Sequence, residues 1–213
     1  MSPRTGRFIT FEGVEGSGKS TQWRRTVKAL EDRGVKLVAT REPGGTPIGA
    51  ELRALLLDPG NRGLDPRAEL LLYCADRVEH MVRLVLPALD RGVTVLCDRY
   101  SDATVAYQAH ARGLGVELVE RVNLGHRPPD LTLLYDVPVD LGLERARGRN
   151  LFSGLEHEAR FEQEALAFHE RVRAGYLAIA AQEPKRVQIV DGARSEDEVF
   201  AATWRHVASV VEA

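Results

Sequence analysis

The sequence predicts an α/β fold in which a five-stranded parallel sheet carries helices on both faces, a doubly wound arrangement. Five short apolar runs, rich in Val, Leu and Ile, alternate with longer stretches of helical periodicity. Strands that are buried on both faces have this composition, and strand–helix alternation makes the sheet parallel. The runs are Phe8–Glu12, Lys36–Thr40, Val93–Asp98, Leu131–Asp136 and Val187–Asp191. Each ends in a polar residue, and such sheets bind ligands outside the carboxyl ends of their strands.

The first run leads into the most informative stretch, Arg7 to Gln22, which reads RFITFEGVEGSGKSTQ. It contains the pattern G-x-x-x-x-G-K-[ST] between a strand and a helix that begins near Lys19. The glycines permit a tight loop, and backbone N–H groups with the helix N-terminus present positive charge to an anion. Lys19 would reach the β- and γ-phosphates, and the Ser20 hydroxyl would bind Mg²⁺. The pattern predicts a nucleoside triphosphate site at Gly13, Val14, Glu15, Gly16, Ser17, Gly18, Lys19, Ser20 and Thr21.

Helical patterns fill the intervals between the runs. Gly34 closes the first helix, the polar loop Arg41–Thr46 precedes the second, and Pro87 is expected to divide or kink a long third region. Gly148–Arg160 breaks the helical pattern, and Ser195–Glu198 is a capping box that starts the last helix. The expected helices are Lys19–Asp32, Pro47–Leu57, a long region from Pro66, Ser101–Ala111, Val116–Leu124, Val139–Arg147, Glu162–Gln182 and one from Ser195.

Length and composition restrict the classes of protein that fit. With 213 residues the chain can form one domain with a full core, and we expect a single domain over 1–213. A net charge of −2 argues against a general nucleic-acid or membrane-surface binder. Cys74 and Cys97 lie in apolar runs, which favours buried, reduced thiols in a cytoplasmic protein over a disulfide or a metal pair. The six histidines lack metal-ligand spacing, and no apolar run approaches the length of a membrane span.

A phosphate loop alone does not separate a kinase from a GTPase or an ATP-driven motor. The sequence lacks the Asn/Thr-Lys-x-Asp segment that reads guanine, and three further stretches discriminate: Arg41–Thr46, Asp98–Tyr100 and Ala106–Gln108. In that order and spacing, together with the phosphate loop, they resemble the thymidylate kinase (dTMP kinase) family. The resemblance continues through Leu131–Pro138 and Phe168–Tyr176. It implies Mg²⁺-assisted phosphorylation of dTMP to dTDP by ATP, for dTTP synthesis, with a mobile lid (about 147–161) and a homodimer.

Phosphoryl transfer depends on positioning and on cations around the transferred group. An arginine that directly follows a strand-end aspartate supplies both. By resemblance, Asp98 helps to organise Mg²⁺ and its waters, and Arg99 contacts the acceptor and the transferred phosphate. An isolated Asp-Arg pair would ordinarily be read as a surface ion pair, but its place at the carboxyl end of a strand favours the functional interpretation.

Recognition of the acceptor requires an aromatic face for the base and polar groups for its edge. Tyr73 stands where the family usually has a Phe stacked on thymine, and Arg77, on the same helix face, would reach a base carbonyl. Tyr107 resembles the residue that excludes a ribose hydroxyl, and Glu15 matches the loop carboxylate that accepts the sugar 3′-OH. Without the resemblance, Tyr73 and Arg77 would be a core aromatic beside a solvated arginine. Arg53 could equally be an exposed helical residue. The implied acceptor set is Glu15, Arg41, Pro43, Arg53, Tyr73, Arg77, Arg99, Thr104, Tyr107 and Gln108.

The phosphate loop holds no arginine, and family members of this kind take the missing positive charge from the lid. The candidates are Arg145, Arg147, Arg149 and Arg160. We favour Arg147 and Arg149, because the helix is expected to give way there to a loop that can close. A solvated basic helix end stays an alternative interpretation for Arg145.

Three departures from the family pattern stand out: Ala103 replaces a usual Ser, Gln108–Arg112 replaces a glycine-rich run, and Ala159–Glu162 lacks the usual Asp before Arg. Two other functions compete with dTMP kinase. One is a kinase for dUMP, dCMP or another nucleoside monophosphate, which Tyr73, Arg77 and Tyr107 would discriminate. The other is a non-catalytic regulator that uses the phosphate loop as a switch, against which the intact Asp98–Arg99 pair argues.

Overall fold

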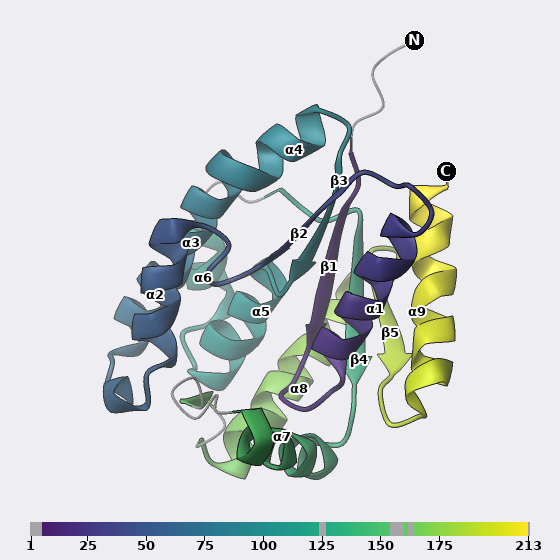
Figure 1. The fold of residues 1–213 in the computed structure, drawn as a ribbon. Coiled ribbons are helices and arrows are strands. Elements are labelled where there is room, and N and C mark those ends of the chain that lie inside the picture. Colours follow the sequence, from purple (N-terminus) through teal and green to yellow (C-terminus); the bar gives the residue numbers. More distant parts are fainter. Residues whose placement is uncertain (1–5, 124–126, 154–159, 162–163, 213) are drawn as a thin grey trace.

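A computed structural model describes residues 6–123, 127–153, 160–161 and 164–212, and it contains a five-stranded parallel sheet (Figure 1). The strand order is β2-β3-β1-β4-β5, so the strand that precedes the phosphate loop lies at the centre. The strands are β1 (Phe8–Gly13), β2 (Leu37–Arg41), β3 (Thr94–Asp98), β4 (Leu131–Asp136) and β5 (Val187–Asp191). All five predicted strands are confirmed, with ends that differ by one residue at most.

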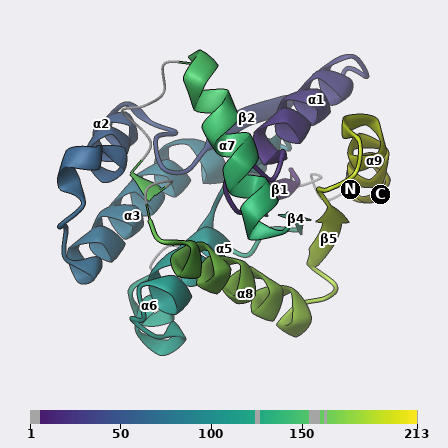
Figure 2. The same ribbon diagram turned by 90° about the horizontal axis from the view of Figure 1, so that it is seen from below.

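The two faces of the sheet are covered by different helices (Figure 2). Because side chains alternate along a strand, Ile9 and Phe11 pack with Leu30 of α1 (Lys19–Glu31) and with Val199 and Val207 of α9 (Glu196–Val211). On the other face, Phe8 packs against residues 81–89, and Leu134 packs against α8 (Leu166–Gln182). The doubly wound prediction is therefore confirmed. On β1, Glu12 falls two residues after Thr10 and four after Phe8, so it faces α8.

The register brings the functional strand ends to one edge. Phe11 of β1 and Arg41 of β2 are both paired with Asp98 of β3. Since all strands are parallel, Glu12, Arg41, Asp98 and the start of the phosphate loop emerge at that edge, as the sequence predicts.

The helical path between β2 and β4 follows the predicted order. α3 (Pro66–His80) passes through a π-helical stretch, Met81–Val85, into α4 (Leu86–Asp90). Pro87 lies in the first turn of α4. The expected division of this region is confirmed, because the π-helical stretch separates α3 from α4 without interrupting the helical path. A second π-helical stretch, Val105–Ala111, extends the short helix α5 (Ser101–Thr104). The remaining helices of this part are α2 (Pro47–Leu57), a 3₁₀ turn at Pro59–Asn61, and α6 (Val116–Val122).

Two helix boundaries clearly differ from the prediction. α7 runs over Val139–Ser153, although Gly148 was expected to end it near Arg147. A single glycine costs a helix only about 1 kcal/mol, and neighbours such as Ala146 are strong helix formers, so the helix continues through it. α8 begins at Leu166 rather than Glu162. Residues 154–159, which belong to the expected lid, and residues 162–163 lie outside the described residues. The capping box at Ser195 and Glu198 is confirmed.

Candidate active site

The phosphate loop has the conformation that its glycines predict. Gly16 and Gly18 have φ values of +69° and +84°, in the region that glycine adopts readily. A Cβ on Gly16 would also collide with the backbone carbonyl of Gly142 in α7. α1 starts at Lys19, and the N–H groups of Thr21 and Gln22 turn back to the Gly18 carbonyl at 3.0 and 3.1 Å. The loop is therefore seated between the end of β1, the start of α1 and the first turns of α7.

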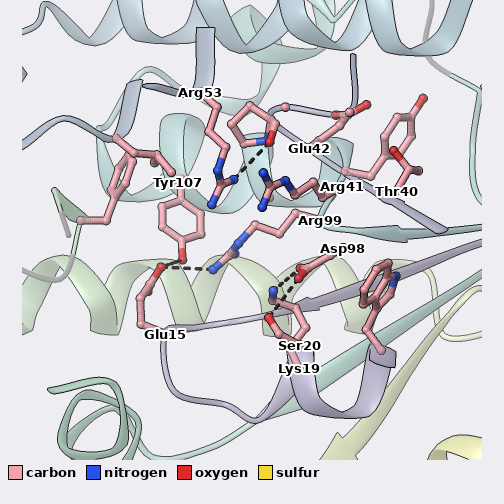
Figure 3. Close-up of a pocket in the computed structure, with 18 of the residues that line it drawn as sticks. Glu15, Lys19, Ser20, Thr40, Arg41, Glu42, Arg53, Asp98, Arg99 and Tyr107 are labelled. Atoms are coloured by element: carbon pink, nitrogen blue, oxygen red, sulfur yellow. Dashed lines mark hydrogen bonds and ion pairs between the residues drawn. The ribbon is translucent and has the colours of Figure 1, made fainter. Parts of the chain in front are cut away.

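Lys19, Ser20 and Asp98 form a compact polar group at the mouth of this loop (Figure 3). The Lys19 ammonium contacts Asp98 Oδ1, and the Ser20 hydroxyl donates to Asp98 Oδ2 at 3.0 Å. Burial alone would raise the pKa of Asp98, but the charges of Lys19 and Arg99 and the hydrogen bonds from Lys19 and Ser20 together outweigh it and lower that pKa. Asp98 is therefore ionised at neutral pH. Among the described residues there is no cluster of three or more His, Cys, Asp or Glu that could hold a metal ion by itself.

Arg99 lies beside this group and is bound on two sides. Its Nη2 donates to Glu15 Oε1 at 3.1 Å, and its Nη1 donates to the Tyr176 hydroxyl at 3.0 Å. The guanidinium also lies over the Tyr107 ring, 5.1 Å from the centroid, a cation–π distance. The Tyr107 hydroxyl donates to the same oxygen, Glu15 Oε1, at 2.6 Å. The structure thus joins three residues that the sequence predicted separately.

Glu15 is charged in spite of its burial. Burial alone would raise its pKa, but neighbouring donors, His169 first and then Arg99, outweigh this effect and lower the pKa to about 2. His169 Nδ1 lies 3.5 Å from Glu15 Oε2. A carboxylate that stays ionised can accept a hydrogen bond from a sugar hydroxyl, which agrees with the role that the sequence predicts for Glu15.

The loop after β2 brings two more arginines to the same space. The side chains of Arg41 and Arg53 point toward that of Arg99 (Figure 3). Arg53 Nη1 donates to the Pro43 carbonyl at 3.1 Å, which ties α2 to the loop. A Cβ on Gly45 would collide with the His80 ring, so the turn can approach α3 only because this residue is glycine. Three guanidinium groups therefore converge beside the phosphate loop.

Arg77 is almost completely buried, with 1% of its surface exposed. Its three guanidinium nitrogens donate to Glu42 Oε2 at 3.0 Å, to Asn123 Oδ1 at 2.7 Å and to Thr104 Oγ1 at 2.7 Å. The other Glu42 oxygen, Oε1, lies 2.8 Å from His80 Nδ1. Arg77 is among the residues that line the substrate cavity, and it anchors three separate segments.

Glu42, His80 and Asn123 were not identified by sequence reasoning. Glu42 belongs to the Arg41–Thr46 stretch that carried the family resemblance, so a signal was present there. His80 and Asn123 carried none, because a lone buried His or Asn has no pattern of its own. Asp76 completes this side by accepting the Gly44 N–H at 3.1 Å, and burial, reinforced by the charge of Glu42, raises its pKa to about 6.

Gln108 and Arg160 meet at a third buried carboxylate, Glu69 of α3. The Gln108 amide donates to Glu69 Oε1 at 2.8 Å, and Arg160 Nη2 lies 2.7 Å from Glu69 Oε2. Arg160 is 1% exposed and also donates to the Leu56 carbonyl at 3.0 Å. Arg160, one of the four lid candidates, is thus held against α2 and α3 rather than at the phosphate loop. Its guanidinium pairs with Glu69 because a buried carboxylate without a counter-charge is costly.

The other lid candidates lie on α7. Arg147 is exposed, and Arg145 Nη1 donates to the Gly192 carbonyl at 2.8 Å. The side chain of Arg149 lies outside the described residues. Ala103 and Tyr73 line the cavity, and the stretch Gln108–Arg112 ends the π-helical turn with the Arg112 N–H bonded to the Tyr107 carbonyl at 2.8 Å.

A single cavity of about 890 Å³ joins these groups. The phosphate loop and Asp98 form one end of it, the three converging arginines lie in the middle, and Tyr73, Thr104, Tyr107 and Gln108 line the other end. A cavity with a phosphate loop, a strand-end Asp-Arg pair and an aromatic pocket defines a P-loop phosphotransferase that holds two substrates at once.

Comparison with known proteins identifies the family. The thymidylate kinase family profile matches residues 11–202. The thymidylate kinase of Syntrophotalea carbinolica is 52% identical to the chain, over 92% of this chain and 93% of the relative. The thymidylate kinase of Nitratidesulfovibrio vulgaris is 51% identical, over 97% of this chain and 98% of the relative. The crystal structure of thymidylate kinase from Ehrlichia chaffeensis superposes with a TM-score of 0.75 at 32% identity, covering 95% of this chain and 99% of that one. The chain belongs to the thymidylate kinase family.

Proposed function

We propose that this chain phosphorylates dTMP to dTDP with ATP as the donor. The single observation that carries the proposal is one cavity lined by both the phosphate loop and the Tyr73–Tyr107 pocket, with Arg99 in contact with Glu15 of the loop and with the Tyr107 ring. A phosphoryl group that passes from one nucleotide to another needs such an arrangement, since both substrates must be aligned with cations at the point of transfer. The relatives' names favour thymidylate over the alternative acceptors.

On the donor side, ATP would lie along residues 13–21, with Lys19 at the β- and γ-phosphates. The backbone N–H groups and the N-terminus of α1 supply positive potential without a flexible side chain. Asp98, which contacts Lys19 here, would keep that ammonium aligned. Lys19 and Arg99 then stabilise the charge that develops on the transferred group.

Ser20 and Asp98 fit a magnesium ion. They offer a hydroxyl and an ionised carboxylate, the oxygen donors that Mg²⁺ prefers, and their oxygens already lie 3.0 Å apart. Mg²⁺ commonly binds with one or two protein oxygens and several waters, so the lack of a larger acidic cluster in the described part of the chain is compatible with it. When bound, the ion neutralises phosphate charge.

On the acceptor side, Tyr73 would stack on the base, and Tyr107 would lie against the sugar. Glu15, bonded to Tyr107, would accept the 3′-OH. Arg99 would bind the acceptor phosphate together with two residues of the neighbouring loop and helix, Arg41 and Arg53. Pro43, Arg77, Thr104 and Gln108 would border the base.

Three further expectations accompany this function. A lid over about 147–161 would close on ATP and supply Arg147 or Arg149. A homodimer would cover apolar side chains that the single chain exposes. Examples are Ile48 on α2, Leu71 on α3 and Val82 in the π-helical stretch Met81–Val85, each of which is more than half exposed. A cytoplasmic location stays a prediction, and no helix among the described residues is long and apolar enough to cross a membrane.

A coupled ATP assay across dTMP, dUMP, dCMP and UMP tests the proposed function. We expect the highest kcat/KM with dTMP and the lowest with UMP, because the Tyr107 side chain would reject the 2′-hydroxyl of the UMP ribose. The Lys19→Ala variant, purified in parallel, controls for a contaminating kinase. Equal turnover of dUMP would favour the broader kinase, and tight binding of both nucleotides with no turnover would favour a regulator.

A further inference from the structure

The backbone at Arg99 has an unusual conformation that strand β1 holds in place. Its φ of +71° lies in the left-handed region, where no other non-glycine residue of the described chain is found. A side chain is strained there, so surrounding contacts must fix it. The Arg99 N–H donates to the Phe11 carbonyl at 3.0 Å, and the next N–H, of Tyr100, donates to Glu12 Oε1 at 2.6 Å. Both hydrogen bonds come from consecutive residues of β1.

The guanidinium of Arg99 is held by two further contacts. Nη1 donates to the Tyr176 hydroxyl and Nη2 to Glu15 Oε1, at 3.0 and 3.1 Å. A guanidinium carries five N–H donors in one plane. Two contacts at different nitrogens fix the orientation of that plane and leave three N–H groups for phosphate oxygens.

Tyr176 connects this guanidinium to Glu12. Its hydroxyl donates to Glu12 Oε2 at 2.7 Å, and a hydroxyl has only one proton to donate. Its lone pairs are therefore available to Arg99 Nη1. Tyr176 is 2% exposed and Glu12 is fully buried, and neither lines the substrate cavity. The Tyr176 ring packs edge-on against Tyr107, with 6.3 Å between the ring centroids, whereas its hydroxyl bonds to Arg99 and Glu12. Removal of the hydroxyl alone therefore tests the connection to Arg99.

The burial of Glu12 itself needs an explanation. A carboxyl group inside a protein is unfavourable unless its oxygens are satisfied. Here Oε1 is used by the backbone after Arg99, and Oε2 is used by the hydroxyl that contacts the Arg99 side chain. One side chain of β1 therefore acts on both the backbone and the guanidinium of the same arginine.

We propose that Glu12 and Tyr176 are positioning residues that set the backbone and the guanidinium of Arg99 for phosphoryl transfer. The inference rests on the proposed role of Arg99 at the transferred phosphate. Transfer is sensitive to small displacements of the groups around the phosphorus. Loss of the Tyr176 hydroxyl should therefore affect turnover more than folding.

The test is Tyr176→Phe, with Tyr135→Phe as the matched control. The Tyr135 hydroxyl is equally buried and bonds to Thr203 Oγ1 at 2.9 Å, on the opposite face of the sheet from Glu12. We expect Tyr176→Phe to lower kcat about tenfold at saturating ATP and dTMP. Tyr135→Phe should leave kcat unchanged, while the thermal stability of both variants falls by a similar amount. An unchanged kcat in Tyr176→Phe, or an equal loss in both variants, would overturn the inference.

The same substitution in an Arg99→Ala background shows whether Tyr176 acts through Arg99. We expect Tyr176→Phe to change kcat less than about twofold there, because the group that it positions is gone. A tenfold loss in both backgrounds would mean that Tyr176 acts independently and would overturn the proposal. If Arg99→Ala alone retains full turnover, the role assigned to Arg99 in the proposed function fails as well. If Arg99→Ala lowers kcat strongly but Tyr176→Phe does not change it, only the inference about Glu12 and Tyr176 fails, and the role of Arg99 stands.

Discussion

The two ends of the cavity are built in different ways. The phosphate end consists of residues 13–20 together with Asp98, and a continuous stretch of sequence supplies nearly all of it. The acceptor end is lined by Tyr73, Thr104, Tyr107 and Gln108. Long-range contacts of Arg77 hold it together: its partners Thr104, Glu42 and Asn123 lie 27, 35 and 46 residues away in the sequence. The phosphate end is therefore a local motif placed on a strand, whereas the acceptor end exists only in the folded chain.

This difference separates two kinds of mutational effect. At the phosphate end, the charged groups face the cavity, so their loss should reduce turnover with little effect on folding. At the acceptor end, the ionised groups are buried against one another, so the loss of one leaves its partner without a counter-charge. The following predictions test this contrast in order of decreasing expected effect.

Lys19→Ala should reduce kcat about a thousandfold. It removes a cation from the transferred phosphate in a site where each such donor contributes about 10²–10³ in rate. Steady-state kinetics with ATP and dTMP measure the loss, and urea unfolding should show stability close to that of the wild type. Lys28→Ala is the control, since that side chain is 76% exposed on the same helix and pairs with the exposed Asp32. A Lys19→Ala variant that unfolds readily would contradict the contrast.

Arg77→Met should lower the free energy of unfolding by about 3 kcal/mol, because the buried Glu42 carboxylate loses its partner. Arg67→Met, on an exposed pair with Asp65 in the same helix, should leave stability unchanged. The double variant Arg77→Met/Glu42→Gln should recover part of the loss, since no unpaired charge then remains. Urea denaturation measures these free energies of unfolding. Equal values for Arg77→Met and Arg67→Met would refute the explanation by a buried ion pair.

Two carboxyl groups near Arg99, those of Glu12 and Glu15, should respond to pH in opposite ways. Burial, together with the charge of Asp102, raises the pKa of Glu12 to about 8, so the folded state binds a proton at this carboxyl more readily than the unfolded chain does. Its contribution to stability is complete below about pH 4.5 and is lost as pH rises through 8. From pH 6 to 9, the unfolding free energy of the wild type should therefore fall by on the order of 2 kcal/mol more than that of Glu12→Gln.

Glu15 provides the counterpart of this measurement. Its pKa is lowered to about 2, so its contribution to stability is present above about pH 4.5 and is lost as pH falls toward 2. Glu15→Gln should flatten the acid side of the stability curve and leave the alkaline side unchanged. Parallel pH curves for the two variants would contradict the opposite environments of these carboxyls.

Arg147→Ala or Arg149→Ala should lower kcat about tenfold with little change in KM for dTMP, if one of them supplies the lid cation. Arg121→Ala on α6 is the control, because that side chain is 76% exposed and does not line the cavity. Unchanged turnover in both α7 variants would exclude a catalytic lid arginine at these positions.

Tyr73→Phe should have the smallest effect, with kcat and KM for dTMP within about twofold of the wild type. Stacking on a base depends on the aromatic ring and not on its hydroxyl. Tyr73→Leu removes the ring, and KM for dTMP should then rise about tenfold. If the phenylalanine variant is as impaired as the leucine variant, the hydroxyl has a role that stacking does not explain.

The accuracy of the sequence prediction follows the same division. Each strand was predicted within a residue, because a buried parallel strand leaves a continuous apolar run. The end of α7 was missed, because one glycine is a weak signal against good helix formers. Arg160 was read among mobile lid residues, and only its contact with Glu69, far away in the sequence, showed it as a buried partner.

By itself, the sequence determined the order of strands and helices, the phosphate loop and the family. These features depend on local backbone chemistry and on periodic patterns, which neighbouring residues carry. Only the tertiary structure decided that Arg77 anchors Glu42, Thr104 and Asn123, and that Glu12 and Tyr176 lie behind Arg99. Such pairings depend on which side chains share a buried volume after the chain has packed, and no spacing along the sequence encodes that proximity.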